Sequence, residues 1–264
     1  MLYLYHGNTS VCAVKVRIAL EEKALAWSGE TLDLFGRCDQ HSPAFRSINP
    51  KGLIPVLKHD GRFLTESSII IEYLDEAFEG PALMPEDPYG RARVRGWLKK
   101  VDEQLHTACT YASFAIAFRD GLLKLAPEQL EAFLSQKVDT EKSGLQRAAI
   151  ELGIAAPHVV RSLQYYDTLL GEMEAALTMH PWLAGKGYSL ADVAVTPYVN
   201  RAAALGLARL WARRPHVEDW FERVRERPSF GTAVTAWVTD ADRQRYAIDT
   251  ESVWAQVTAA LGRA

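Results

Sequence analysis

Apolar and polar positions in the first part of the chain alternate between the patterns of strands and of helices. Residues 2–6 are apolar and aromatic, which predicts a strand, and the spacing at 11–23 predicts a helix after a turn at 7–10. Residues 27–34 predict a second strand. A short loop therefore joins the first strand to the first helix.

A hairpin and a further helix complete this part of the chain. Residues 54–58 and 62–65 are predicted to form two strands around an Asp-Gly turn at 60–61. Residues 67–78 carry an amphipathic helical pattern. Because βαβ followed by ββα is the order of a thioredoxin-like domain, we expect residues 1–80 to form an α/β domain with a mixed four-stranded sheet.

The pattern changes after residue 80. One glycine and three prolines within residues 79–88 indicate a linker, which we place at 81–88. The remaining chain, 89–264, is predicted to be an all-α helical bundle domain. Its helical periodicity extends over 91–119, 127–136, 158–179, 190–207 and 217–224.

Composition and charge exclude several classes of protein. The formal net charge is −3 and the Lys and Arg residues are scattered, so no nucleic-acid partner is expected. No uncharged apolar run approaches the roughly 18 residues that span a bilayer, and a signal-peptide pattern is lacking, so we expect no membrane association and a cytoplasmic location. Cys12, Cys38 and Cys109 are widely spaced, which favours neither a disulfide framework nor a bound metal.

The loop after the first strand contains Asn8, Thr9 and Ser10, and the next helix begins near Cys12. Free backbone N–H groups and the helix dipole stabilise an anion at such a position, and a thiolate is an anion. Lowering a thiol pKa by two units needs about 2.7 kcal/mol, which one or two charge-assisted hydrogen bonds supply. Ser10 is therefore a candidate for thiolate stabilisation or a simple helix cap. Cys12 is a candidate nucleophile or a small buried side chain.

Two further junctions carry candidate binding groups. The dipeptide Ile54-Pro55 opens a predicted strand, which suits a cis bond or a trans-proline at a sheet edge. A cis bond would turn the Ile54 backbone outward, where a peptide-like ligand would pair as an added strand. Ser67 is predicted to cap the next helix, whose N–H groups would accept a carboxylate while Glu66 pairs with an ammonium group. The alternative is a capping serine after a solvated glutamate.

These segments together resemble the glutathione S-transferase family. The resemblance rests on four motifs in order along the chain: Ser10-Val-Cys-Ala-Val-Lys-Val-Arg-Ile-Ala-Leu20, Asn49-Pro-Lys-Gly-Leu-Ile-Pro-Val-Leu57, Thr65-Glu-Ser-Ser68 and Gly185-Lys-Gly-Tyr-Ser-Leu-Ala-Asp192. In the last motif, Ser189 and Asp192 form a helix-capping signature. The chain looks closest to the bacterial β-aryl-etherase branch, which cleaves ethers in lignin degradation, and this similarity includes an insertion near 120–156.

The resemblance implies glutathione as the co-substrate. Ser10 would donate a hydrogen bond to the glutathione sulfur, with Thr9, Asn8 and Cys12 as alternatives. The other contacts would come from three short segments: Ile54 and Pro55 for the cysteinyl part, Glu66 and Ser67 for the γ-glutamyl end, and Gln40 and His41 for the glycyl carboxylate. A histidine in a polar loop is otherwise simply solvated.

The electrophile would lie against the first long helix of the helical domain. Aromatic and apolar residues recur there at spacings that place several of them on one face: Trp97, Val101, Tyr111, Phe114 and Phe118. Such a stripe is otherwise part of the core. Facing a thiolate, it would suit an aromatic electrophile.

We therefore expect an enzyme and favour glutathione-dependent β-aryl ether cleavage, in which the thiolate displaces a phenoxide. Three alternatives stay open: general conjugation or dehalogenation, a Cys12-dependent thiol oxidoreductase, and a glutathione-binding protein without catalysis. Relatives are usually dimers, so a homodimer is expected.

Overall fold

The computed structural model describes residues 1–136 and 139–262 and divides into two compact units. The first unit comprises Met1–Lys99, Met179–Pro197 and Trp220–Thr239, and the second comprises Lys100–Thr178, Tyr198–Asp219 and Asp240–Ala264. Each unit is thus assembled from three stretches of chain. The domain limits 1–80, 81–88 and 89–264 stay a prediction.

The first unit is built on a mixed sheet with strand order β2-β1-β3-β4. Its strands are β1 (Leu2–His6), β2 (Trp27–Thr31), β3 (Val56–His59) and β4 (Arg62–Leu64). β1 runs parallel to β2 and antiparallel to β3, and β3 forms the predicted hairpin with β4. These directions are those of a thioredoxin-like domain, so the predicted α/β class is confirmed for this part of the chain.

The second strand is shorter than the predicted segment 27–34. After its end, the Asp33 carboxylate accepts hydrogen bonds from the backbone N–H groups of Phe35, Gly36 and Arg37 at 3.1, 2.8 and 3.0 Å. A side chain that satisfies nearby N–H groups competes with the strand ladder. The chain therefore turns away from the sheet at Asp33.

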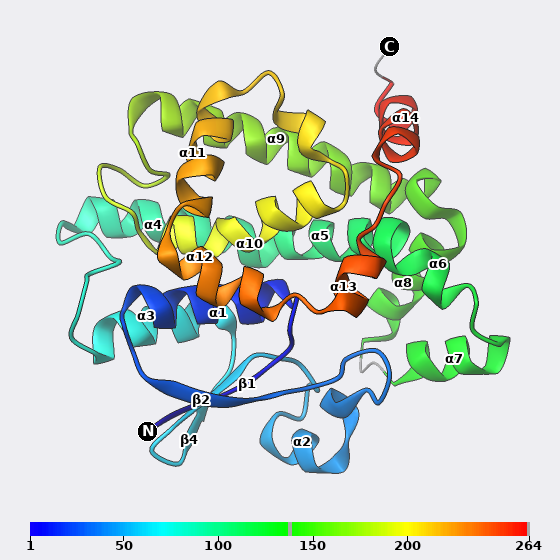
Figure 1. Ribbon diagram of the computed structural model, residues 1–264, viewed down its shortest axis with the longest axis horizontal. Coiled ribbons are helices and arrows are strands. Elements are labelled where there is room, and N and C mark those ends of the chain that lie inside the picture. The colour runs from blue at the N-terminus through cyan, green and yellow to red at the C-terminus, as the bar shows by residue number, and fades with distance from the viewer. Residues whose placement is uncertain (137–138, 263–264) are drawn as a thin grey trace. The chain divides into compact units, whose positions relative to one another are not determined.

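Helices cover both faces of the sheet (Figure 1). On one face α1 (Val11–Glu22) packs against α3 (Ser67–Ala77). On the other face lies α2 (Pro43–Ile48), whose Phe45 meets Tyr5 of β1 with ring centroids 5.8 Å apart. This helix was not predicted, because six residues are too few for a helical period to be recognised.

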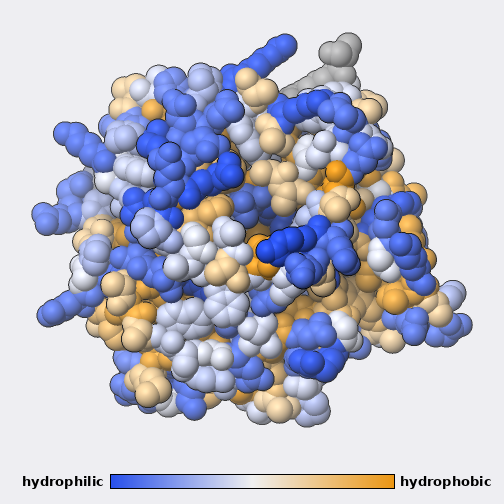
Figure 2. Space-filling model, in the orientation of Figure 1, coloured by the Kyte–Doolittle hydropathy of each residue, from blue (hydrophilic) through white to orange (hydrophobic). Residues whose placement is uncertain are grey.

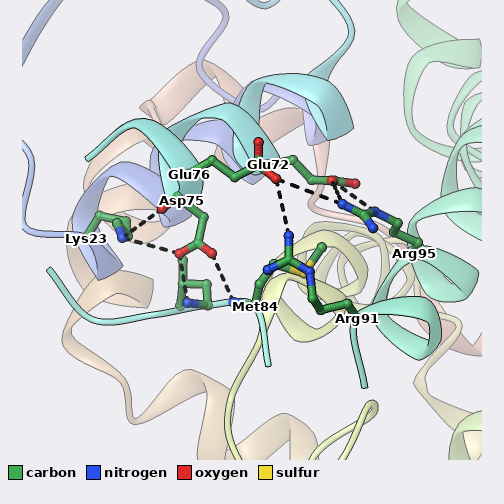
Figure 3. Close-up of polar contacts among 8 residues, drawn as sticks. Lys23, Glu72, Asp75, Glu76, Met84, Arg91 and Arg95 are labelled. Atoms are coloured by element: carbon green, nitrogen blue, oxygen red, sulfur yellow. Dashed lines mark hydrogen bonds and ion pairs between the residues drawn. The ribbon is translucent and has the colours of Figure 1, made fainter. Parts of the chain in front are cut away.

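A buried carboxylate of α3 orders the predicted linker. Asp75 accepts hydrogen bonds from Lys23 Nζ at 3.3 Å and from the backbone N–H groups of Leu83 and Met84 at 2.8 and 3.1 Å (Figure 3). Backbone groups bonded to a buried side chain are restrained in place. The segment 81–88 is therefore fastened to α3.

A second buried carboxylate stands at the start of α10 (Leu190–Ala204). One oxygen of Asp192 accepts from the Ser189 N–H and hydroxyl, each at 3.0 Å. The other accepts from the Trp220 indole at 2.9 Å and the Leu183 N–H at 3.1 Å. The predicted capping interaction is present, with the serine hydroxyl donating to the acid.

The rest of the C-terminal part is helical, as predicted. The second unit contains α5 (His106–Ser113), α6 (Arg119–Leu122), α7 (Pro127–Ser135), α8 (Thr140–Leu152), α13 (Asp240–Arg245) and α14 (Thr250–Ala260). α4 (Pro88–Lys100), α9 (Pro157–Met179), α10 and α11 (Pro215–Arg225) contribute to both units, and α12 (Pro228–Ala233) lies in the first. The helices α8, α12, α13 and α14 lie outside the predicted segments.

The long helix predicted over 91–119 is interrupted twice. Val101–Leu105 and Phe114–Phe118 are π-helical turns. Such wide turns change the direction of the side chains around them and frequently occur at functional sites. Both turns lie within the predicted electrophile-binding stripe.

The visible surface is mainly hydrophilic, and its apolar areas are broken up by polar side chains (Figure 2). Within residues 1–136 and 139–262, no helix combines the length and the apolar character that crossing a bilayer requires.

Candidate active site

The strand order gathers four loops at one edge of the sheet. His6 at the end of β1 pairs with Thr31 at the end of β2, and Tyr5 pairs with Val56 at the start of β3. Because β4 is antiparallel to β3, its end at Leu64 lies at the same edge. The loops that contain the predicted glutathione contacts therefore meet there.

Two glycines allow these loops to approach closely. A Cβ atom on Gly7 would lie 3.0 Å from Cδ1 of Ile54, so the isoleucine side chain packs on the first loop. A Cβ atom on Gly52, whose φ is +62°, would lie 2.8 Å from Nδ1 of His41. Larger residues at either position would separate the loops.

Ser10 is the N-cap of α1. Its Oγ accepts a hydrogen bond from the Ala13 N–H at 3.4 Å, and its carbonyl accepts one from Val14 at 2.8 Å. A serine hydroxyl has one hydrogen to donate and two lone pairs, so capping leaves its donor function available. Thr9 and Cys12 are also part-exposed in this region.

The Ile54–Pro55 peptide bond is cis, the first of the two alternatives that the sequence left open. Asn49 Nδ2 donates to the Leu53 carbonyl at 2.7 Å and Asn49 Oδ1 accepts from the Lys51 N–H at 3.2 Å, which shapes the loop before the proline. Within the described residues, the backbone N–H and carbonyl of Ile54 have no hydrogen-bond partner. An extended ligand would find both groups available.

The prediction that Ser67 caps α3 is wrong. Glu66 occupies the N-cap position with φ +66° and ψ 104°, and Ser67 is the first helical residue. The positive φ turns the chain abruptly from β4 into the helix, so the helix begins one residue earlier than a Ser67 cap would give. Glu66 is exposed and its Oε1 lies 2.9 Å from Nζ of Lys51, while Ser67 is buried.

Gln40 and His41 belong to a short 3-10 turn, Asp39–His41. Gln40 Nε2 donates to the Leu34 carbonyl at 3.2 Å. Its Oε1 is buried and has no partner within the described residues. His41 Nδ1 lies 3.5 Å from a guanidinium nitrogen of Arg46.

Arg17 was missed from the sequence, although a charged residue inside an apolar helical run is itself a signal. Its side chain is fully buried beneath the first loop. The guanidinium donates to the carbonyls of Gly7 at 3.1 Å and Asn8 at 2.6 Å. It also donates to the Ala233 carbonyl at 2.9 Å and lies 3.1 Å from Nδ1 of His6.

Burial sets the charges of this pair. It lowers the pKa of Arg17 to about 9, so the guanidinium remains charged at neutral pH. Burial, together with the charge of Arg17, lowers the pKa of His6 to about 4. His6 is therefore neutral at pH 7, and its Nδ1 accepts the hydrogen bond from Arg17.

The predicted electrophile residues are divided between the units. Trp97 belongs to the first, where its indole N–H donates to the Leu183 carbonyl at 3.1 Å. Val101, Tyr111 and Phe114 belong to the second and are buried.

The structure brings two of these aromatic residues together in the second unit. The rings of Phe114 and Phe118 lie 5.3 Å apart in an edge-to-face contact, and Phe118 is part-exposed. Tyr111 instead packs edge-to-face on His158, with ring centroids 4.7 Å apart. Nε2 of His158 is buried and has no partner within the described residues. His158 was not singled out from the sequence.

Among residues 1–136 and 139–262, no three His, Cys, Asp or Glu side chains are grouped to hold a metal ion.

Two family models match the chain: the glutathione S-transferase N-terminal domain over residues 4–82 and the C-terminal domain over residues 129–228. Protein LigF of Sphingobium sp. (strain NBRC 103272 / SYK-6) is 29% identical over 239 residues, which cover 86% of this chain and 91% of LigF. The tetrachloro-p-hydroquinone reductive dehalogenase of Sphingobium chlorophenolicum is 27% identical, covering 87% of this chain and 94% of that protein.

Solved structures show the same likeness. The crystal structure of beta-etherase LigF superposes with a TM-score of 0.79 at 28% identity, covering 88% of this chain and 98% of that one. Maleylacetoacetate isomerase from Methylobacterium extorquens, crystallised with bound malonate and GSH, gives a TM-score of 0.64 at 28% identity, covering 88% and 95%. The chain therefore belongs to the glutathione S-transferase superfamily and is a glutathione transferase that uses glutathione as its co-substrate.

Proposed function

We propose that this glutathione transferase cleaves β-aryl ethers of the kind found in lignin. The observation that carries the proposal is the match to beta-etherase LigF along 98% of that chain, with a TM-score of 0.79. The aromatic stripe expected to contact the electrophile is compatible with a substrate of this class.

The reaction is a nucleophilic displacement. The glutathione thiol loses its proton, and the thiolate attacks the carbon that bears the aryloxy group. A carbon–sulfur bond forms as the carbon–oxygen bond breaks, and the phenoxide leaves with the bonding electrons and takes up a proton. No oxidant or reductant is consumed, so positioning and thiolate stabilisation are the tasks of the protein.

We assign thiolate stabilisation to Ser10. Its oxygen accepts a hydrogen bond from the Ala13 N–H, and its hydroxyl hydrogen would form a hydrogen bond to the glutathione sulfur. The start of α1 adds the positive end of a helix dipole. Thr9, Asn8 and Cys12 remain the alternatives.

The other glutathione contacts are proposed at the same edge of the sheet. The backbone of Ile54, which has no hydrogen-bond partner among the described residues, would pair with the cysteinyl part beside Pro55. The N–H groups around Ser67 would hold the α-carboxylate of the γ-glutamyl end. Glu66 would exchange its exposed partner Lys51 for the ligand ammonium, since an exposed ion pair contributes little.

Gln40 and His41 are proposed for the glycyl carboxylate. The packing of Gly52 against His41 brings this turn to the proline loop. The amide N–H₂ of Gln40 and an N–H of the His41 ring are donors suited to a carboxylate.

We propose Phe118 as the first aromatic contact of the electrophile, because it is the part-exposed member of the stripe. Phe114 supports its ring from the side. Trp97, Val101 and Tyr111 are buried, so their proposed contribution to the electrophile site would be indirect.

Product analysis tests the proposed reaction. The protein is incubated with glutathione and, separately, with a β-aryl ether dimer, a chlorodinitrobenzene-type electrophile and a chlorinated hydroquinone. We expect the ether to yield a glutathione thioether and a free phenol by mass spectrometry. Products from the chlorinated compounds alone would favour conjugation or dehalogenation, the second candidate, which the similarity to the tetrachloro-p-hydroquinone dehalogenase supports. Binding of glutathione without turnover of any of the three compounds would reject all three as substrates.

Two variants test the catalytic assignment. Ser10→Ala should lower kcat by about 10- to 100-fold, the effect of one hydrogen bond to a charged group, whereas Cys12→Ala should retain most activity. Thr9→Val tests the alternative hydroxyl and should retain most activity if Ser10 is the donor. If Cys12→Ala abolishes turnover and Ser10→Ala does not, the thiol oxidoreductase alternative replaces this assignment.

We also propose that the protein acts as a homodimer in the cytoplasm. Membership of the superfamily supports the dimer, and the ordinary balance of apolar and charged residues is compatible with that location.

A further inference from the structure

Arg17 is a buried cation, and the part of the chain that the structure describes places no carboxylate beside it. Its hydrogen bonds go to three backbone carbonyls and to the neutral ring of His6. Within residues 1–136 and 139–262, no carboxylate lies within ion-pair distance of its guanidinium. A buried charge without an opposite charge is costly, so such an arrangement requires an explanation.

Carboxylates on the elements that surround α1 are engaged elsewhere. Glu22 at the end of α1 pairs with Arg227 at 2.6 Å. Asp75 on the facing side of α3 pairs with Lys23 (Figure 3).

The remaining charged groups of α3 and α1 also have partners. On the outer side of α3, Glu72 and Glu76 meet Arg95 and Arg91. The other buried cation of α1, Lys15, donates to the Ser68 hydroxyl at 2.9 Å. None of these groups contacts Arg17, and His6 is its one titratable neighbour among the described residues.

An aromatic ring covers the guanidinium and is part of a small aromatic cluster. The Arg17 Cζ lies 4.8 Å from the ring centroid of Trp237. Trp237 in turn meets His6 edge-to-face at 4.7 Å and stacks on Trp27 at 5.9 Å. Rings of this size exclude water, and a charge in an environment of low dielectric acts over a longer distance.

The bonds of Arg17 direct this charge toward the first loop. Two of its donors hold the carbonyls of Gly7 and Asn8, immediately before Thr9 and Ser10. The positive end of α1 lies at the same place. Two sources of positive potential thus converge on the loop where the glutathione sulfur is proposed to lie.

We propose that Arg17 is a positioning residue for glutathione activation, which holds the first loop in place and supplies the buried positive charge that a bound thiolate neutralises. The inference rests on the proposed place of the sulfur at Ser10, and it does not depend on which electrophile is attacked. A neutral thiol would leave the cation uncompensated, so binding favours the ionised form.

The pH dependence of kcat tests this role. Saturating glutathione and a chlorodinitrobenzene-type electrophile are used with the wild type, Arg17→Met and Arg17→Lys. In Arg17→Met the pH of half-maximal kcat should rise by about one unit, which corresponds to about tenfold less thiolate at lower pH. The affinity for glutathione, measured by calorimetry, should change much less than kcat. Because His6 is neutral above about pH 5, its titration does not enter this range.

A matched substitution separates charge from packing. Arg17→Lys keeps the charge but loses the forked hydrogen bonds, so its profile should lie nearer the wild type than that of Arg17→Met. Arg227→Lys makes the same change at an arginine that already has a carboxylate partner, and its profile should be unchanged. If Arg17→Met does not fold, Arg17→Lys and Arg227→Lys still test the role of Arg17. Arg17→Lys loses the forked hydrogen bonds that hold the first loop, so we expect a lower kcat in this variant and an unchanged kcat in Arg227→Lys.

The outcomes distinguish this inference from the proposed function. A shifted profile in a protein that cleaves no aryl ether supports Arg17 and rejects the etherase assignment. Ether cleavage with an unshifted profile in folded Arg17→Met, or equal kcat in the two lysine variants, overturns the role of Arg17 and leaves the etherase assignment standing.

Discussion

Single residues of the first unit carry ionisable groups where water cannot reach them. His6, Arg17 and Asp192 are all buried, and each meets the cost of burial through hydrogen bonds to neighbours. The first two form a pair in which one group stays charged and the other stays neutral. Their titration therefore couples pH to the stability of the sheet.

The burial of His6 predicts that stability falls in mild acid. Its pKa is about 4 in the folded protein, whereas an unburied histidine has a pKa of 6.5, so between these values the unfolded chain binds more protons. This contribution to stability is complete above pH 6.5 and is lost as pH falls through 4, by about 3 kcal/mol in total. Urea unfolding at pH 7, 6 and 5 would measure this loss.

His6→Asn serves as the comparison, because an amide oxygen can still accept the bond from Arg17. Its stability curve should be flatter than that of the wild type between pH 6.5 and 5. Burial also lowers the pKa of His158. Its titration therefore makes stability fall with falling pH in the wild type and in His6→Asn alike. Parallel curves for the two proteins would contradict the assignment to His6.

The elements of the first unit begin and end at side chains that satisfy backbone groups. Ser10 caps α1, Asp33 ends β2, and Asp192 accepts four donors at the start of α10. These local bonds fix where α1 and α10 start and where β2 ends. The start of α10 is the most heavily bonded of the three.

Removing the Asp192 carboxylate should strongly destabilise the protein. Asp192→Ala leaves the Leu183, Ser189 and Trp220 donors unsatisfied in the core, at a cost of about 3–5 kcal/mol in the free energy of unfolding. Ser189→Ala removes one of these bonds and should cost about 1 kcal/mol. Denaturant unfolding of the two variants measures both values.

The stability losses of Asp192→Ala and Ser189→Ala are informative when they are compared. If both variants lose the same stability, the capping bond alone matters, and the bonds from Leu183 and Trp220 do not contribute. Glutathione binding measured well below the unfolding transition should be retained in Ser189→Ala.

At the scale of the whole molecule, residues far apart in the chain complete the first unit. Arg227 and Ser229 bond to Glu22, and the Ala233 carbonyl accepts from Arg17, across more than 200 positions of sequence. The sheet therefore depends on the segment 220–239 for its packing.

The proposed homodimer gives a prediction at the same scale. Light scattering coupled to size exclusion should give twice the chain mass of 29.5 kDa. Dilution should not change the value across the concentration range of the activity assays. A mass of one chain under active conditions would reject the dimer.

Much of the fold could be predicted because short stretches of sequence determine where its strands and helices lie. The four strands of the first 80 residues and the helices α1 and α3 were predicted in the correct order, and the cis Ile54–Pro55 bond was one of two predicted alternatives. Alternation, helical period and turn residues are all readable within a window of a few residues. Short helices such as α2 and α12 escape that window, and packing rather than periodicity stabilises them.

The candidate site, like the fold, was predicted from the sequence in part. The sequence by itself determined the loops at Ser10, Ile54 and Glu66 as candidate contacts, because each combines a helix start or proline with a suitable side chain. Only the tertiary structure decided that these loops share one edge, that Glu66 takes a positive φ, and that Arg17 is buried with no carboxylate beside it among the described residues. Burial of a charge depends on which distant segments pack over it, and no local pattern contains that information.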